Sequence, residues 1–169
     1  MNHKQFKVTV TRQLPEPVET RMKELFDVNL SNSPHPLTRD QLLEIVKDCD
    51  VLVPTIGDKI DENFIKESGK RLKLIANYGV GFDHIDVLIA TKKGITVTNT
   101  PNVLTEDTAD MAMALIISVP RRIKEGVKKL ADDAWDGWAP NALLGHRIHG
   151  KRLGILGMGR IGQAIARRA

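Results

Sequence analysis

Short apolar runs alternate with amphipathic stretches along the first hundred residues of the chain. The apolar runs predict strands, at Val8–Thr11, Asp27–Leu30, Asp50–Pro54, Leu72–Ala76 and Ile95–Thr98. The amphipathic stretches predict helices, which begin near Pro15, Thr38, Asp61 and Asp86. Nearly continuous apolar strands that alternate with helices are typical of a parallel sheet covered on both faces, so the sequence predicts an α/β fold.

The pattern changes after Thr100-Pro101-Asn102. One long helical segment is expected from Thr105 to about Leu130, with apolar residues at helical spacing. Pro120 interrupts it, so a kink or a break is expected near Val119. We therefore predict two domains, residues 1–101 and residues 102–169. The second would begin with this helical segment.

A glycine-rich turn lies near the end of the sequence. Residues 157–162 read G-x-G-x-x-G, and they follow the apolar run Leu153–Leu156 and precede a helix-like stretch. A strand, a tight glycine turn and a helix form the context of a dinucleotide pyrophosphate site. Gly157 would permit the turn, Gly159 would let the pyrophosphate approach the backbone, and Gly162 would let helix and strand pack closely. Free N–H groups at the helix start would then face the phosphates.

A second glycine turn, Asn77–Asp83, follows the predicted strand Leu72–Ala76. Ligands of open parallel sheets bind beyond the carboxyl ends of the strands. Gly79 and Gly81 flank Val80, so backbone N–H groups there are placed to face a carboxylate. The alternative is a plain tight turn, with Asp83 capping the helix that follows.

Composition excludes several classes of protein. The net charge of +4 is too small to indicate a nucleic-acid partner, and only 4% of the residues are aromatic. Four arginines, Arg152, Arg160, Arg167 and Arg168, are read as phosphate-side or solvated helix charges rather than as a nucleic-acid surface. The glycine turn lacks the Gly-Lys-Ser/Thr ending of a nucleotide-hydrolysing P-loop.

The single cysteine, Cys49, excludes an internal disulfide and fits a reducing compartment. The sequence shows no signal-peptide core, no apolar run long enough to span a membrane and no metal-binding motif. We expect a cytoplasmic protein with neither a membrane nor a metal partner.

Three segments together resemble the D-isomer-specific 2-hydroxyacid dehydrogenases, and within them the glyoxylate and hydroxypyruvate reductase branch. They are Asn77–Asp83 with Asp86, Asn99-Thr100-Pro101 followed by Thr108-Ala109-Asp110, and Leu153–Ala166. The resemblance implies a flavodoxin-like substrate domain followed by the start of a Rossmann NAD(P)-binding domain, here truncated.

The resemblance also implies an activity and its binding residues. The activity is reduction of a small 2-keto acid to a D-2-hydroxy acid with NADH or NADPH. Val80 and Gly81 would hold the substrate carboxylate, and Thr108 would contact the cofactor. The pyrophosphate would lie on Gly157, Met158, Gly159, Arg160, Ile161 and Gly162.

No catalytic residue is assigned within this sequence. In the family an arginine, an acidic residue and a histidine do the chemistry, and all three are expected beyond residue 169. His84, His146 and His149 have no acidic partner placed by a recognisable motif. We therefore expect the 169-residue chain to be inactive alone, and the full-length enzyme to be a homodimer. The alternatives are an inactive fragment or an NAD-binding, corepressor-like regulator on the same fold.

Overall fold

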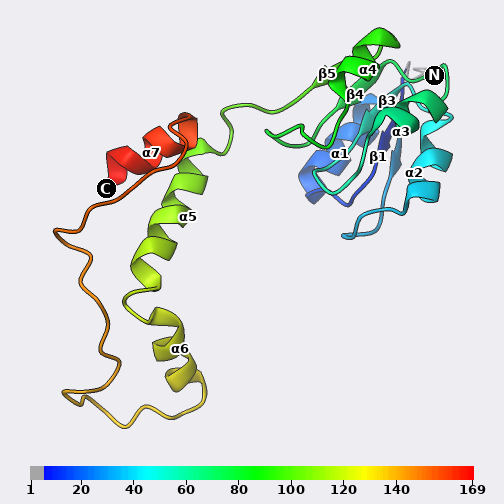
Figure 1. Cartoon of the computed structure of the whole chain (residues 1–169). Helices are drawn as coiled ribbons and strands as arrows, with labels where there is room; N and C mark the ends of the chain where they lie inside the picture. Colours follow the sequence, from blue (N-terminus) through cyan, green and yellow to red (C-terminus); the bar gives the residue numbers. More distant parts are fainter. Residues whose placement is uncertain (1–5) are drawn as a thin grey trace. The chain divides into compact units, whose positions relative to one another are not determined.

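The computed structural model describes residues 6–169 and divides into two compact units. The first ends at Asn102, and the second covers Val103–Ala169 (Figure 1). Each unit is described by itself. The expected absence of a signal peptide concerns in part residues 1–5, which lie outside the described part.

The first unit is built on a five-stranded parallel sheet. Its strands are β1 (Lys7–Val10), β2 (Asp27–Leu30), β3 (Val51–Val53), β4 (Leu74–Ala76) and β5 (Thr96–Thr98), in the order β2-β1-β3-β4-β5. Val8 pairs with Val51, and Leu52 with Ile75. This is the flavodoxin-like strand order. The predicted α/β fold is confirmed.

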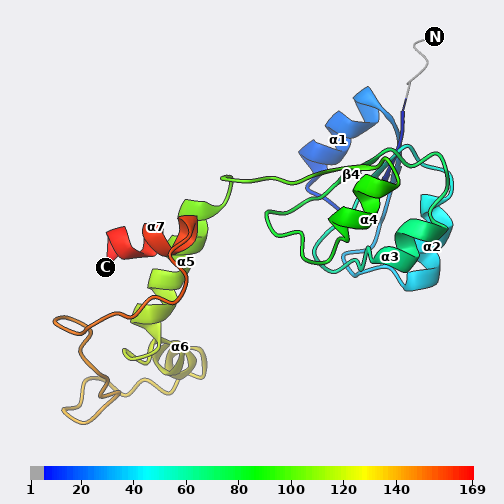
Figure 2. The same cartoon turned by 45° about the horizontal axis from the view of Figure 1, so that its top comes forward.

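Four helices flank the sheet: α1 (Glu16–Leu25), α2 (Arg39–Val46), α3 (Glu62–Glu67) and α4 (Val87–Lys92). The larger core packs α2, α3 and α4 on one face around Leu52, Phe64 and Ile75, which are fully buried. A smaller core lies under α1 and contains Val8 and Val10. Figure 2 shows α1 apart from α2 and α3, across the strands.

Cys49 lies in the larger core. Burial raises the pKa of its thiol to about 11. The thiol is therefore neutral near pH 7, which fits a packing role rather than nucleophilic chemistry.

Side-chain caps begin three of these helices. The expected capping box is present: the Thr38 hydroxyl accepts from the Gln41 N–H at 3.3 Å, and the Gln41 side chain accepts from the Thr38 N–H at 2.9 Å. Asp61 caps α3. The cap of α4 is Asp86, whose carboxylate accepts from the Ile89 N–H at 3.0 Å. The expectation that Asp83 caps this helix was wrong, because the turn continues three residues further before the helix starts.

Lys7, Arg71, Asp48 and Asp50 form an ion-pair cluster at the amino ends of β1, β3 and β4. Asp50 accepts from Arg71 Nε at 2.8 Å and from the Lys7 N–H at 2.7 Å. Asp48 pairs with Lys7 and, at 3.1 Å, with Arg71. These contacts lower the carboxyl pKa values: the Arg71 hydrogen bond is the largest cause for Asp50, and the Lys7 hydrogen bond for Asp48.

We expect Arg71→Met to destabilise the first unit near pH 7 and to have a smaller effect near pH 2. A carboxylate whose pKa is lowered by folding stabilises the fold above its ordinary pKa of 3.8, and that contribution is lost as the pH falls through the lowered value. The measurement is urea unfolding at both pH values, followed by the NMR signals of β1. An equal loss of stability at pH 7 and pH 2 would contradict this account.

The second unit is helical. It contains α5 (Thr105–Ser118), α6 (Ile123–Ala131) and α7 (Arg160–Arg168). The break predicted near Val119 is confirmed, since α5 ends at Ser118 and α6 begins at Ile123. Arg122, between the two helices, adopts a left-handed conformation with φ of 57°. The chain then returns as an irregular segment that leads to α7, which lies against the first half of α5 (Figure 1).

Small side chains and ion pairs join α7 to α5. Ala109 and Ala164 are fully buried. Arg168 Nε donates to Asp110 at 2.6 Å, and Arg167 Nη2 donates to Glu106 at 3.1 Å. The pairs with Asp110 and Glu106 raise the pKa of Arg168 further above its ordinary value.

The apolar run Leu153–Leu156 is not a strand in this structure. A strand needs a neighbour for its ladder of hydrogen bonds, and no segment within residues 6–169 pairs with this run. Leu156 is fully exposed as a result.

Within residues 6–169, no helix has both the length and the apolar character needed to cross a membrane.

Candidate functional site

The first candidate site lies where β4 and β5 end, at the carboxyl edge of the sheet. The turn from Tyr78 to Asp83 follows β4, and Asn99 follows β5. Because the strands are parallel, these segments meet at the same edge, where ligands of such sheets bind. Two hydrogen bonds tie the turn to its neighbours. The Tyr78 N–H donates to the Pro54 carbonyl at 2.9 Å, and the Thr100 N–H donates to the Gly79 carbonyl at 3.0 Å.

Two asparagine side chains donate hydrogen bonds to the backbone carbonyls of this turn. Asn77 Nδ2 donates to the Gly79 carbonyl at 3.1 Å and to the Gly81 carbonyl at 2.9 Å. Asn99 Nδ2 donates to the Val80 carbonyl at 2.8 Å. Three successive carbonyls are therefore held by the protein itself.

The amide groups of the same turn remain available. Within residues 6–169, no protein group accepts a hydrogen bond from the N–H of Val80 or of Gly81. Gly81 is exposed, and a Cβ built on it would meet only Asp83 Oδ2, at 4.0 Å. Backbone N–H groups that are accessible and unpaired can accept an anion such as a carboxylate.

His84 supports the turn from within. Its Nε2 lies 3.0 Å from Asn77 Oδ1. Partial burial lowers the pKa of the imidazole, and the nearby charges of Asp58 and Asp83 oppose that shift only in part. The sequence indicated no partner for His84, because the contact depends on the path of the turn. The sequence did contain one signal for these contacts: Asn77 and Asn99 each follow directly after a strand, where their side chains meet at the same edge of the sheet.

The second candidate site is the glycine turn of the second unit. Gly157 has a φ of 97°, a left-handed conformation that favours glycine. A Cβ on Gly162 would overlap the Gly157 carbonyl oxygen and would lie 3.1 Å from the carbonyl carbon. Gly159 is the N-cap of α7, and a Cβ built there would meet nothing within 4 Å.

Gly157 thus forms the predicted sharp turn, and Gly162 is in close contact with that turn rather than with a strand, since residues 153–156 form none. The space at Gly159 is open, and its predicted contact with a pyrophosphate stays a prediction. Two amides of the first turn of α7, those of Ile161 and Gly162, donate no hydrogen bond within the described residues. Met158 is exposed and Arg160 begins the helix. The turn thus fits a pyrophosphate in shape and in hydrogen-bonding groups.

Thr108, on α5, is the remaining predicted cofactor contact. It lies exposed in the first turns of α5, and its N–H donates to the Leu104 carbonyl at 3.0 Å. No hydrogen bond between described residues joins it to residues 157–162. Its expected contact with a cofactor stays a prediction.

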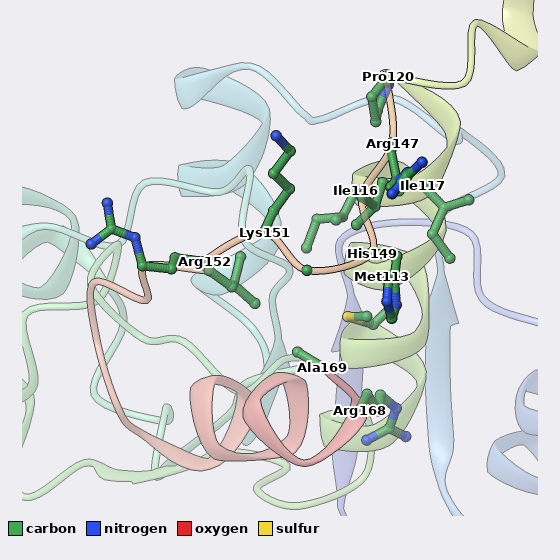
Figure 3. A pocket seen from close by; sticks show the side chains of 13 residues that line it. Met113, Ile116, Ile117, Pro120, Arg147, His149, Lys151, Arg152, Arg168 and Ala169 are labelled. Atoms are coloured by element: carbon green, nitrogen blue, oxygen red, sulfur yellow. The ribbon is translucent and has the colours of Figure 1, made fainter. Parts of the chain in front are cut away.

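A cavity of about 570 Å³ lies elsewhere in the second unit (Figure 3). It is lined by α5, by residues 147–153 and by the end of α7, including Met113, Ile116 and Arg168. The cavity meets Leu153 at the amino end of the apolar run, whereas nucleotide sites lie beyond the carboxyl end. It is therefore not the site that the glycine turn would form.

Across residues 6–169, no group of three side chains is arranged to bind a metal ion.

Comparison with known proteins gives a consistent result. Residues 8–163 match the family model described as "D-isomer specific 2-hydroxyacid dehydrogenase, catalytic domain". The chain is 45% identical over 164 residues to a glyoxylate reductase of Korarchaeum cryptofilum, and 45% identical over 167 residues to one of Pyrococcus furiosus. Each alignment covers 96% of this chain and 49% of the relative, so the chain spans about half the length of these relatives.

Solved structures agree. An NAD-binding D-isomer specific 2-hydroxyacid dehydrogenase from Polaromonas sp. superposes with a TM-score of 0.89 at 36% identity, over 96% of this chain and 51% of that one. An NADPH-dependent glyoxylate/hydroxypyruvate reductase from Sinorhizobium meliloti, in complex with NADP and malonate, gives a TM-score of 0.76 at 31% identity. That match covers 97% of this chain and 50% of the other.

Proposed function

Since the chain belongs to the D-isomer specific 2-hydroxyacid dehydrogenase family, we propose that it provides two binding elements of an oxidoreductase that reduces a 2-keto acid. The turn at Val80 and Gly81 binds the carboxylate of a small 2-keto acid such as glyoxylate or hydroxypyruvate. The product is the D-2-hydroxy acid. The observation that carries this proposal is the pair of unpaired amides at the carboxyl edge of the sheet.

The cofactor of this proposal is NADH or NADPH, which supplies the hydride when bound. Residues 157–162 hold its pyrophosphate: the open side of Gly159 admits the phosphates, and the amides of Ile161 and Gly162 donate to them. Arg160 adds a positive charge. Thr108 contacts the cofactor from α5. In domain terms, residues 1–101 form the substrate domain, and residues 102–169 begin the nucleotide-binding domain.

The two elements bind and orient, but they supply no proton donor. His84 is the imidazole nearest in sequence to the carboxylate turn, and its Nε2 is hydrogen-bonded to Asn77. Reduction of a keto group needs a general acid within hydrogen-bond reach of the carbonyl oxygen. We therefore propose that the catalytic groups come from the half of the family's chain that this sequence does not include, and that the complete enzyme is a homodimer.

The test is a chimera in which residues 1–169 are joined to the remaining half of the Pyrococcus furiosus glyoxylate reductase. We expect this chimera to oxidise NADH or NADPH in the presence of glyoxylate or hydroxypyruvate, as followed by absorbance. The 169-residue chain alone should oxidise neither cofactor. Turnover by the chain alone, or a folded chimera without turnover, would contradict the proposal.

Two substitutions in the chimera test the two binding elements separately. Gly81→Ala should raise the KM for glyoxylate about tenfold, because a methyl group obstructs one amide, and it should leave the melting temperature unchanged because the space around it is open. Gly159→Ala should instead raise the KM for the cofactor by a similar factor. A matched control is Gly94→Asn, at a left-handed position after α4 that Asn tolerates, which should change neither KM.

A further inference from the structure

We propose that Asn77 and His84 are positioning residues for the carboxylate-binding turn: His84 fixes the side-chain amide of Asn77, and Asn77 holds the Gly79 and Gly81 carbonyls on either side of the free Val80 and Gly81 N–H groups, while Asn99 holds the Val80 carbonyl between them. This inference rests on the proposed function, because it concerns the same turn. It adds two residues that make no contact with the substrate.

Peptide geometry links the held carbonyls to the free amides. In a trans peptide the C=O of one residue and the N–H of the next lie in one plane and point in opposite directions. The Gly79 carbonyl therefore sets the direction of the Val80 N–H, and the Val80 carbonyl sets that of the Gly81 N–H. Asn77 holds the first carbonyl at 3.1 Å and Asn99 holds the second at 2.8 Å. Each carbonyl is held toward the interior of the protein, so the N–H of the same peptide points away from the asparagine that holds it.

The orientation of the Asn77 amide follows from its partners. Its Nδ2 carries two hydrogens, and these meet the carbonyls of Gly79 and Gly81, which can only accept. Its Oδ1 must then face His84, at 3.0 Å. Because that oxygen is an acceptor, His84 must donate from Nε2.

Burial makes this arrangement difficult to replace. Asn77 is only 2% exposed, so water has little access to its amide if a partner is removed. Without the His84 donor, the Asn77 oxygen is buried and unpaired. Rotation of the amide would not relieve this, because its oxygen would then face two carbonyls that can only accept, so the side chain is expected to shift instead. The Gly81 carbonyl has no other donor within the described residues, whereas the Gly79 carbonyl keeps the Thr100 N–H. Loss of His84 should therefore disturb the turn without unfolding the sheet.

NMR of the ¹⁵N,¹³C-labelled 169-residue chain tests this inference, with acetate and glyoxylate as carboxylate probes and acetamide as their neutral counterpart. We expect the His84 ring to show the Nε2–H tautomer. We also expect both carboxylates, but not acetamide, to shift the Val80 and Gly81 amides. His84→Leu should weaken acetate binding about tenfold and move the Gly79 and Gly81 carbonyl signals. His84→Gln keeps an N–H donor. It should restore acetate binding to within about twofold of the wild type and return the carbonyl signals to their wild-type positions.

The outcomes separate the inference from the proposed function. If neither carboxylate shifts the Val80 and Gly81 amide signals of the wild type, the proposed carboxylate site is wrong. The His84 tautomer and the carbonyl signals of His84→Leu still decide the roles of Asn77 and His84. If the wild type binds but His84→Leu binds equally well, or if the ring carries its proton on Nδ1, the inference is wrong and the carboxylate site stands. His35→Leu, at an exposed histidine in a loop, is the control and should change nothing.

Discussion

Gly162→Ala is expected to destabilise the packing of α7 on α5 by about 2 kcal/mol. Alanine is ordinarily favoured over glycine inside a helix by about 1 kcal/mol. Here the added methyl group would overlap the backbone carbonyl of Gly157, which cannot move without opening the glycine turn. Overpacking of this kind costs about 1–3 kcal/mol, and a clash with backbone belongs at the upper end. The net effect is therefore destabilising.

Gly126→Ala on α6 is the matched control and should have the opposite sign. A Cβ at Gly126 would meet Leu143 Cδ1 at 3.6 Å, which is ordinary van der Waals contact. We expect a gain of about 0.5–1 kcal/mol from helix propensity alone. Amide hydrogen exchange of α6 and α7 measures both effects. Slower exchange in α7 of Gly162→Ala would show that the close approach of helix and turn is wrong.

Phe64→Ala is expected to destabilise the first unit by about 4 kcal/mol. Phe64 is fully buried in the larger core, and loss of a buried aromatic side chain costs about 3–5 kcal/mol through lost transfer energy and the cavity left behind. The substitution also removes the ring that lies 5.3 Å from the guanidinium carbon of Arg39. Since α3 is held to the sheet through this side chain, its amides should lose protection first.

Urea unfolding followed by the NMR signals of β3 and β4 measures this loss. Leu88→Ala is the control, because Leu88 on α4 is 76% exposed and its truncation should cost less than about 0.5 kcal/mol. Similar costs for the two substitutions would mean that the core on this face is not close-packed.

The sequence determined the type and order of the elements because those depend on neighbouring residues. Apolar runs predicted all five strands of the sheet, and Pro120 predicted the break after α5. The capping box at Thr38 was also predictable, since both of its partners lie within three residues. The glycine spacing predicted the sharp turn at Gly157 and a close approach at Gly162, although Gly162 approaches the turn and not a strand.

Only the tertiary structure decided which groups of the candidate carboxylate site are occupied and which are free. The contacts that decide it cross between separate segments: Asn99 reaches Val80 from the next strand, and the Thr100 N–H reaches Gly79. The partner of His84 and the cap of α4 depend on the path of the turn from Asn77 to Asp86. Residues 153–156 have the composition of a strand, yet they form none here, because a strand exists only where a neighbour completes its hydrogen bonds. Local pattern fixes what a segment can become, and hydrogen-bond partners distant in sequence determine what it does.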